Sequence, residues 1–361
     1  MKFSASTSEL SRTLTNVARI CSKSPSPSTA GVMLSLDGNT LTIAGFDLSV
    51  SLVATLEVKG SLSGTSLVPA TVLSQIVAAF TGPETFVDSA TEPHRLLVSS
   101  LDASASLATL SLDEYPTLPP TLSSRISLSQ ADLRTAIKEI RYAVSTDDSR
   151  GVISSLCLDS TVSPPVLVAT DSLRMAATEL SGLTGLDPKK TLLSRVAVDE
   201  LARLLSEGEV SLAVDSSFIS FHLPGFVLTA RLQAGEYPVW SSIMNQPRPL
   251  SLTADVASLL HALRQVDPVA KDTTYIEIKL SANQLNVASV AEQGQASAQV
   301  SVEYSGSPVT FRVNPRFLKD TLSAIGSEKV SISFNEDLTR PLELTPAGSP
   351  TRHLVMPIRV V

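Results

Sequence analysis

Apolar and polar residues alternate through much of the chain, and these alternating runs are interrupted by segments with helical spacing. Leu10, Leu14 and Val17 recur every three or four residues, which predicts a helix over 8–20. The alternating runs that follow, such as 32–36 and 50–58, predict strands. Because the strands come in runs joined by short turns, we expect antiparallel sheets and an α+β fold class. Further helices are predicted over 69–80, 129–145, 195–206, 253–266 and 314–325.

The predicted elements recur with a period close to 122 residues. A segment ending Glu-Tyr-Pro stops at Pro116 and again at Pro238, and the opening strand-and-helix segment begins at Phe3, Ile126 and Leu250. No single match is strong, but several weak matches that share one period indicate a repeated domain. The sequence therefore predicts three tandem copies, each with two helices and antiparallel sheets. Their predicted boundaries are 1–122, 123–244 and 245–361.

Composition limits the class of protein. Hydrophobic residues make up 43% of the chain, enough for a sizeable core, and the only two cysteines, Cys21 and Cys157, exclude a disulfide scaffold or a cysteine-cluster zinc site. The start of the chain lacks an apolar leader, and the longest apolar stretches, such as 67–80, are too short for a membrane helix. We therefore expect a cytoplasmic protein with no membrane partner.

Charge is distributed unevenly between the predicted elements. The formal net charge is −7, yet the six predicted helices hold ten basic and seven acidic residues, a net of +3 that leaves −10 for the rest. One interpretation is a set of ordinary amphipathic helices with solvated faces. The other is that the helices share one face that meets a polyanion, while an acidic strand surface repels non-specific DNA.

No catalytic motif is recognisable. The four histidines are isolated, and no glycine-rich phosphate-binding motif is present, so we expect no cofactor. Asp147 and Asp148 could hold a metal, which leaves an enzyme with a carboxylate site as a remote alternative, but their polar neighbours favour a solvated loop. Asp47 and Asp171 recur at an offset of 124, which favours a structural turn in each copy over two active sites.

Three further segments carry a family resemblance. Residues 168–175 read VATDSLRM, residues 235–238 read GEYP, and the chain ends HLVMPIRVV. With the threefold repeat, they resemble the bacterial DNA polymerase III beta subunit, the sliding-clamp family. The resemblance implies a head-to-tail homodimeric ring of clamp domains that encircles double-stranded DNA without regard to sequence. Such a protein is a processivity factor and not an enzyme.

The resemblance also implies a partner pocket between the second and third domains. It would take a short, partly apolar peptide from the polymerase III alpha subunit, the clamp loader or a repair polymerase, with Arg174 holding the polar end of the peptide. From the residues alone, the segment 355–358 could equally be a terminal strand in a core. The implied peptide-binding residues are Ile153, Thr170, Leu173, Arg174, Met175, Pro238, Ile243, Val355, Met356, Pro357, Ile358 and Arg359.

DNA contacts and a subunit interface follow from the same resemblance. The implied DNA-binding residues are Lys23, Arg141, Arg150, Arg195 and Arg203. The dimer is expected to form by edge-strand pairing, in which the segment 104–110 meets the third domain near 275–280. Leu107, Gln265 and Val266 are the expected interface residues.

One departure from the family pattern motivates an alternative. Ser172 and Leu173 replace residues common in relatives. The alternative is that the protein is a divergent clamp paralogue, such as a drug-insensitive second clamp in the same organism.

Overall fold

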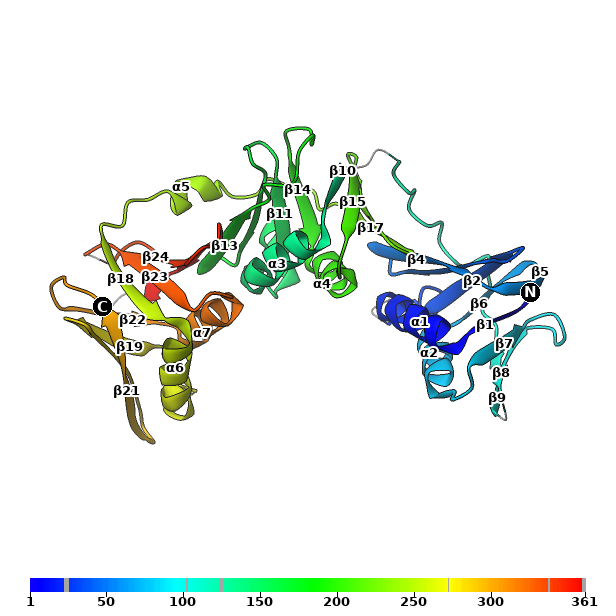
Figure 1. Cartoon of the computed structure of the whole chain (residues 1–361), viewed down its shortest axis with the longest axis horizontal. Coiled ribbons are helices and arrows are strands. Elements are labelled where there is room, and N and C mark those ends of the chain that lie inside the picture. The colour runs from blue at the N-terminus through cyan, green and yellow to red at the C-terminus, as the bar shows by residue number, and fades with distance from the viewer. Residues whose placement is uncertain (23–25, 102, 124–125, 272, 337, 359–361) are drawn as a thin grey trace. The chain divides into compact units, whose positions relative to one another are not determined.

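A computed structural model describes residues 1–22, 26–101, 103–123, 126–271, 273–336 and 338–358 (Figure 1). By their contacts the residues form two compact units, 1–130 with 199–232 and 131–198 with 233–361. No helix among the described residues combines the length and the apolar character needed to cross a membrane.

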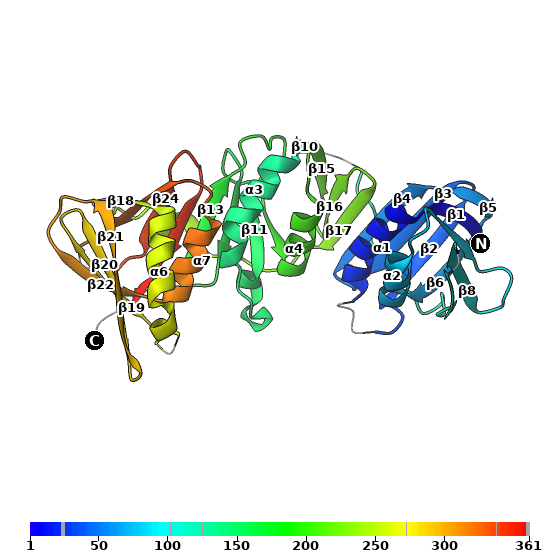
Figure 2. The same ribbon diagram turned by 60° about the horizontal axis from the view of Figure 1, so that its bottom comes forward.

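The first unit contains a five-stranded antiparallel sheet and two helices from the start of the chain. Helices α1 (Thr7–Cys21) and α2 (Ala70–Ala79) lie side by side (Figure 2), and α1 buries Leu10, Leu14 and Val17, as the helical spacing predicted. The strand order is β5 (Lys59–Leu62), β1 (Lys2–Ser6), β7 (Glu84–Asp88), β8 (Arg95–Ser100) and β9 (Ala103–Ala108).

An eight-stranded sheet in the same unit joins strands from the first and second sequence copies. Strands β17 and β4 pair antiparallel, with Val227 opposite Val53, so the main-chain hydrogen bonds continue from one copy into the next. The strand order is β10 (Ile126–Ser129), β15 (Glu209–Val214), β16 (Phe218–Leu223), β17 (Phe226–Arg231), β4 (Val50–Glu57), β3 (Thr40–Phe46), β2 (Gly31–Asp37) and β6 (Gly64–Pro69).

The second unit is built on a thirteen-stranded sheet that likewise joins two copies. Strands β13 and β25 pair antiparallel, with Met175 opposite Leu354. The strand order is β14 (Lys190–Ser194), β11 (Ser155–Asp159), β12 (Val166–Thr170), β13 (Arg174–Glu179), β25 (Arg352–Val355), β24 (Leu342–Pro346), β23 (Lys329–Phe334), β18 (Leu250–Asp255), β21 (Gly294–Glu303), β20 (Gln284–Ala291), β19 (Ile276–Ser281), β22 (Val309–Val313) and β26 (Pro357–Ile358).

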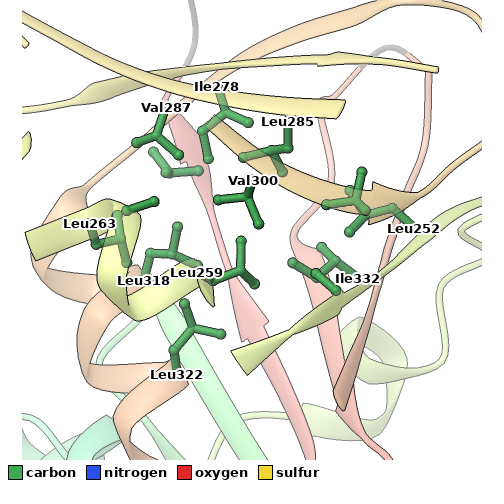
Figure 3. Packing of buried hydrophobic residues seen from close by; sticks show 14 of the residues in the cluster. Leu252, Leu259, Leu263, Ile278, Leu285, Val287, Val300, Leu318, Leu322 and Ile332 are labelled. Atoms are coloured by element: carbon green, nitrogen blue, oxygen red, sulfur yellow. The ribbon is translucent and has the colours of Figure 1, made fainter. Parts of the chain in front are cut away.

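Helices α6 (Val256–Ala270) and α7 (Pro315–Ala324) pack on this sheet in the third copy. Figure 3 shows the core between them, where Leu259 and Leu263 of α6 and Leu318 of α7 meet the strand residues Ile278 and Val300. The remaining helices are α3 (Gln130–Ile140), α4 (Arg195–Leu204) and α5 (Trp240–Met244), with 3₁₀ segments η1 (Arg141–Ala143) and η2 (Asp148–Ser154).

The α+β class and the antiparallel sheets are confirmed, with corrections at some element ends. The helix predicted over 253–266 begins at Val256, because the apolar alternation continues as β18 through Ala254; the Asp255 carboxylate then caps the helix by accepting from Ser258 N at 2.7 Å. The helix predicted over 129–145 ends as an α-helix at Ile140 and continues as η1. Helix α5 was not predicted.

Candidate functional site

A tight turn between β12 and β13 exposes one leucine. The Asp171 carboxylate accepts hydrogen bonds from Leu173 N at 3.0 Å and Arg174 N at 2.9 Å, and Ser172 has a positive φ of 77°. Thr170 Oγ1 donates to Arg174 O at 2.8 Å and accepts from Ser172 N at 3.1 Å. These bonds fix the turn and leave Leu173 50% exposed.

The same turn occurs in the first copy. The Asp47 carboxylate accepts from Ser49 N at 2.9 Å and from Val50 N at 2.7 Å, and Leu48 has the same φ of 77° as Ser172. The prediction of a repeated structural turn at Asp47 and Asp171 is therefore confirmed.

The C-terminal segment runs alongside this turn. Strand β25 pairs with β13, and Met356 N donates to Leu173 O at 2.9 Å. Met356 is the one residue between β25 and β26, and β26 pairs with β22 through Pro357 opposite Val313. The tail thus does form terminal strands, while the residue between them is free to face a cavity.

The segment that connects the second copy to the third crosses the same sheet. Tyr237 Oη donates to Val168 O at 3.3 Å, and α5 follows directly. The buried Arg248 guanidinium donates to Ile243 O at 3.1 Å, Met244 O at 3.0 Å and Pro341 O at 2.8 Å, and pairs with Glu343 at 2.9 Å. One arginine therefore fastens the end of α5 to the loop before β24.

Together these segments enclose a pocket of about 220 Å³, called here the first pocket. Seven predicted residues line it: Thr170, Leu173, Arg174, Met175, Pro238, Ile243 and Met356. Ser172, Pro341 and Leu354 also line it and were not predicted. The walls are mainly apolar, so the pocket suits apolar side chains of a ligand.

The other predicted peptide-binding residues lie elsewhere. Val355 is fully buried and pairs with both Arg174 and Leu342 in the sheet, while Pro357 and Ile358 form β26. Ile153 is buried in η2 and is not among the residues lining the first pocket. Arg359 lies outside the described residues.

Arg174 is occupied by the protein itself. Its side chain is 6% exposed, and its guanidinium pairs with Asp171 at 2.8 Å and with Asp320 of α7 at 2.7 Å. It also lies over the rings of Tyr142 and Phe317, at 5.2 Å and 4.7 Å from their centroids. We had expected Arg174 to hold the polar end of a peptide; instead, its charge joins β13 to α7.

His353 lies behind this cluster and gives a pH-dependent prediction. The ring is fully buried, its Nδ1 is 3.1 Å from Tyr142 Oη, and its Nε2 has no partner among the described residues. Burial lowers the pKa of His353 from 6.5 to about 4. A lowered histidine pKa stabilises the fold above pH 6.5, and this contribution is lost as the pH falls toward 4. We expect a loss of about 2 kcal/mol in unfolding free energy between pH 7.5 and 5, measured by urea denaturation. The His353→Asn variant should lack this component; an unchanged pH profile would contradict the assignment.

The Asp147 carboxylate lies at the start of η2. Among the described residues no group of three His, Cys, Asp or Glu side chains could hold a metal ion. The Asp147 carboxylate instead caps η2 by accepting from Ser149 N at 3.0 Å, and its hydrogen bonds with Ser149 lower its pKa.

The family comparisons cover nearly the whole chain. Models of the DNA polymerase III beta subunit match residues 1–119 for the N-terminal domain, 127–239 for the central domain and 245–359 for the C-terminal domain. The chain belongs to the DNA polymerase III beta subunit family.

Individual relatives agree with this assignment. The beta sliding clamp of Pseudomonas aeruginosa is 27% identical over 341 residues, which cover 92% of this chain and 93% of that protein. The beta sliding clamp homolog GriR of Streptomyces muensis is 26% identical and covers 99% of both chains. A crystal structure of the P. aeruginosa clamp with ligand superposes with a TM-score of 0.92 at 26% identity over 100% of both chains. The prediction of three tandem clamp domains is confirmed.

Within this clamp family member, the expected DNA-binding residues occupy different settings. Arg141 is exposed in η1, and Arg195 is half-buried at the start of α4. Arg203 pairs with Glu200 at 2.7 Å. Arg150 donates to Asp171 O at 2.7 Å and Ser172 Oγ at 3.0 Å, so it supports the turn beside the first pocket. Lys23 lies outside the described residues.

The expected interface residues of the clamp are also separated. Leu107 lies half-buried on β9, the edge strand of its sheet. Gln265 is exposed on α6, whereas Val266 is 1% exposed and belongs to the core of the third copy. A charged residue at position 266 would therefore destabilise the core of the third copy, so such a variant would not test an interface directly.

The strand expected to pair across the interface has no free edge. Residues 276–281 form β19, which is flanked by β20 and β22, so the expectation that 275–280 pairs with another subunit is wrong. The free edge lies on β21. Within the described chain its residues Gly294 to Ser301 pair with β20 alone, and Val302 and Glu303 pair with β18.

Proposed function

We propose that this sliding-clamp family member is a non-catalytic processivity factor that forms a head-to-tail dimeric ring around duplex DNA. The observation that carries the proposal is the first pocket, which three segments far apart in sequence assemble. The apolar walls suit a short peptide with leucine- or phenylalanine-type side chains. The proposed partners are the polymerase III alpha subunit, the clamp loader and repair polymerases, and the proposed location is the cytoplasm.

The exposed helix bases support sequence-independent DNA contact. Arg12, Arg19, Arg134, Lys138 and Arg264 are exposed on α1, α3 and α6. Contacts of such bases with phosphates carry no base information and weaken with salt. We retain Lys23, Arg141, Arg195 and Arg203 as proposed DNA contacts, but propose that Arg150 mainly supports the pocket. The proposed domain boundaries remain 122/123 and 244/245.

Topological retention on DNA tests the ring. Protein loaded onto nicked circular DNA by its clamp loader should stay bound through gel filtration, and linearising the DNA should release it. Release is expected because a ring slides off a free end, whereas a protein bound at a site does not. Equal retention on circular and linear DNA would contradict the proposal.

We propose that β9 of one subunit pairs with the free edge of β21 in the other. Both edges lack charged side chains: residues 103–108 read ASASLA and residues 294–300 read GQASAQV. Edge strands in monomeric proteins are usually protected by charges, so two uncharged edges are suited to pairing. Figures 1 and 2 both show the β20–β21 hairpin projecting from its sheet, which leaves this edge accessible.

The Leu107→Asp variant is therefore expected to shift the solution mass from about 76 kDa, twice the 38.1 kDa of the chain, toward the monomer. Raising salt should leave the wild-type dimer largely intact, because the paired strands carry no charges. The control is Leu97→Asp, at a half-buried leucine on the interior strand β8. A Leu107→Asp protein with unchanged mass in light scattering would argue against this pairing.

A further inference from the structure

A second pocket lies beside α5 and has about the same size as the first. Its volume is about 230 Å³, and its lining includes Val166, Ala177, Glu179, Trp240, Met244 and Arg352. Ile243 of α5 lines the first pocket, while Trp240 and Met244 of the same helix line the second. The five-residue helix thus separates the two cavities.

Both pockets open on the same face of β13. Side chains alternate along a strand, so Met175, Ala177 and Glu179 point to one face. Met175 lines the first pocket, and Ala177 and Glu179 line the second. Four residues of strand span roughly 13 Å. An extended peptide of about four residues could therefore reach from one pocket to the other.

Exposed apolar side chains mark this route. Leu173 at the first pocket is 50% exposed, Val239 between the pocket-lining residues Pro238 and Trp240 is 67% exposed, and Val162 at the second pocket is 39% exposed. Apolar residues gathered in this way are typical of an interaction surface. Their continuity with the first pocket indicates that one partner covers both.

The second pocket has an apolar floor and one carboxylate without a partner. Val166, Ala177 and Met244 are buried. Arg352 donates to Glu343 at 2.6 Å, Asn245 Oδ1 at 3.1 Å and Met244 O at 2.8 Å, so its charge is already engaged. Glu179 is exposed and makes no side-chain hydrogen bond or ion pair within the described part of the chain. The lining therefore suits a side chain with an apolar stem and a positive end.

We propose that a partner peptide seated in the first pocket continues into the second, where a lysine or arginine lays its stem on the apolar floor and pairs with Glu179. This inference rests on the proposed function, because it assumes that the first pocket holds a partner peptide. The proposal predicts that the clamp recognises a basic residue of the peptide in addition to the apolar anchor, about four positions away from it.

Fluorescein-labelled synthetic peptides test the proposal with the full-length protein. Each peptide carries a Leu-Phe pair and, four residues to its N-terminal or C-terminal side, Lys, Gly or Glu. Fluorescence polarisation gives the affinity. The unlabelled peptides are titrated against the emission of Trp240, the only tryptophan in the sequence and a wall of the second pocket.

In one of the two orientations, the Lys peptide should bind roughly tenfold tighter than the Gly peptide, and the Glu peptide should gain nothing. The Lys peptide should also shift the Trp240 emission beyond the shift caused by the Gly peptide. The Glu179→Gln variant should lose most of the Lys advantage while binding the Gly peptide as the wild type does. The matched control, Glu292→Gln at the exposed β20–β21 turn, should keep the advantage.

Each failure has a distinct meaning. Equal affinities for the Lys, Gly and Glu peptides in both orientations would overturn the second-pocket proposal and leave the first pocket standing. A Lys advantage that survives in Glu179→Gln would overturn it as well. No binding of any peptide to the wild type would overturn the proposed peptide function and this inference together.

Discussion

Replacing Leu173 with aspartate is expected to weaken binding of a Leu-Phe peptide by at least about fiftyfold. Leu173 stands 50% exposed at the first pocket, where an apolar ligand side chain would cover it. A carboxylate there would be desolvated without a partner when the peptide binds, which costs on the order of 2–3 kcal/mol. Fluorescence polarisation measures the affinity, and gel filtration checks that the dimer is intact.

The repeat supplies a matched control. Leu48 lies 46% exposed in the equivalent turn of the first copy, one position before Ser49, whose N–H donates to Asp47 as the N–H of Leu173 donates to Asp171. Because Leu48 does not line the first pocket, Leu48→Asp should bind the peptide as the wild type does. An equal loss in both variants would point to a general effect on the fold, and no loss in Leu173→Asp would show that the pocket is not the peptide site.

Replacing Arg174 with alanine is expected to lower the free energy of unfolding by about 3 kcal/mol or more. The change leaves the buried carboxylate of Asp171 without its ion pair, releases Asp320 of α7, and removes the guanidinium from the Tyr142 and Phe317 rings. Losing one partner of a buried pair is strongly destabilising because the remaining charge stays buried. Urea denaturation followed by circular dichroism measures the effect.

Two variants define what this result means. Lys329→Ala removes an ion pair with Glu303 in which both side chains are more than half exposed, and should cost less than about 1 kcal/mol. Arg174→Lys keeps the positive charge but lacks the planar guanidinium that pairs with both Asp171 and Asp320. It should therefore recover only part of the lost unfolding free energy. An Arg174→Ala protein that is as stable as wild type but binds the peptide poorly would restore the earlier expectation that Arg174 contacts the ligand.

Local patterns predicted most helices and strands, because burial on one face leaves a period in the sequence. The predicted helix over 8–20 compares with α1 at Thr7–Cys21, and the predicted strand over 32–36 lies within β2 at Gly31–Asp37. The predicted start of α6 was wrong because a strand pattern and a helix pattern adjoin there. The alternation of Leu250, Leu252 and Ala254 in β18 is followed directly by the helical spacing of α6. Helix α5 is too short to show a period at all.

The site was only partly predictable for a different reason. Leu173, Met175 and Met356 were found through motifs that resemble the family, but Pro341 lies in no such motif, and Leu354, although part of the C-terminal motif, was not assigned to the pocket. The pairing of Arg174 with Asp320 joins residues 146 positions apart, and nothing in either local sequence indicates it. Local sequence was insufficient for two interface residues or segments as well. Helical spacing alone could not tell whether Val266 lies in a core or on a surface. The pairing of β19 on both sides depends on the order of strands in the sheet, which its own sequence does not contain.

The way the sheets cross the copy boundaries has a consequence for how the chain folds. The β4–β17 pairing ties the second copy to the first, and the β13–β25 pairing ties another part of the second copy to the third. A fragment that contained the middle copy alone would expose two bare strand edges, β17 and β13, each ready to pair with another chain. We therefore expect the middle copy to be unstable as an isolated fragment, because strands of both neighbouring copies complete its two sheets.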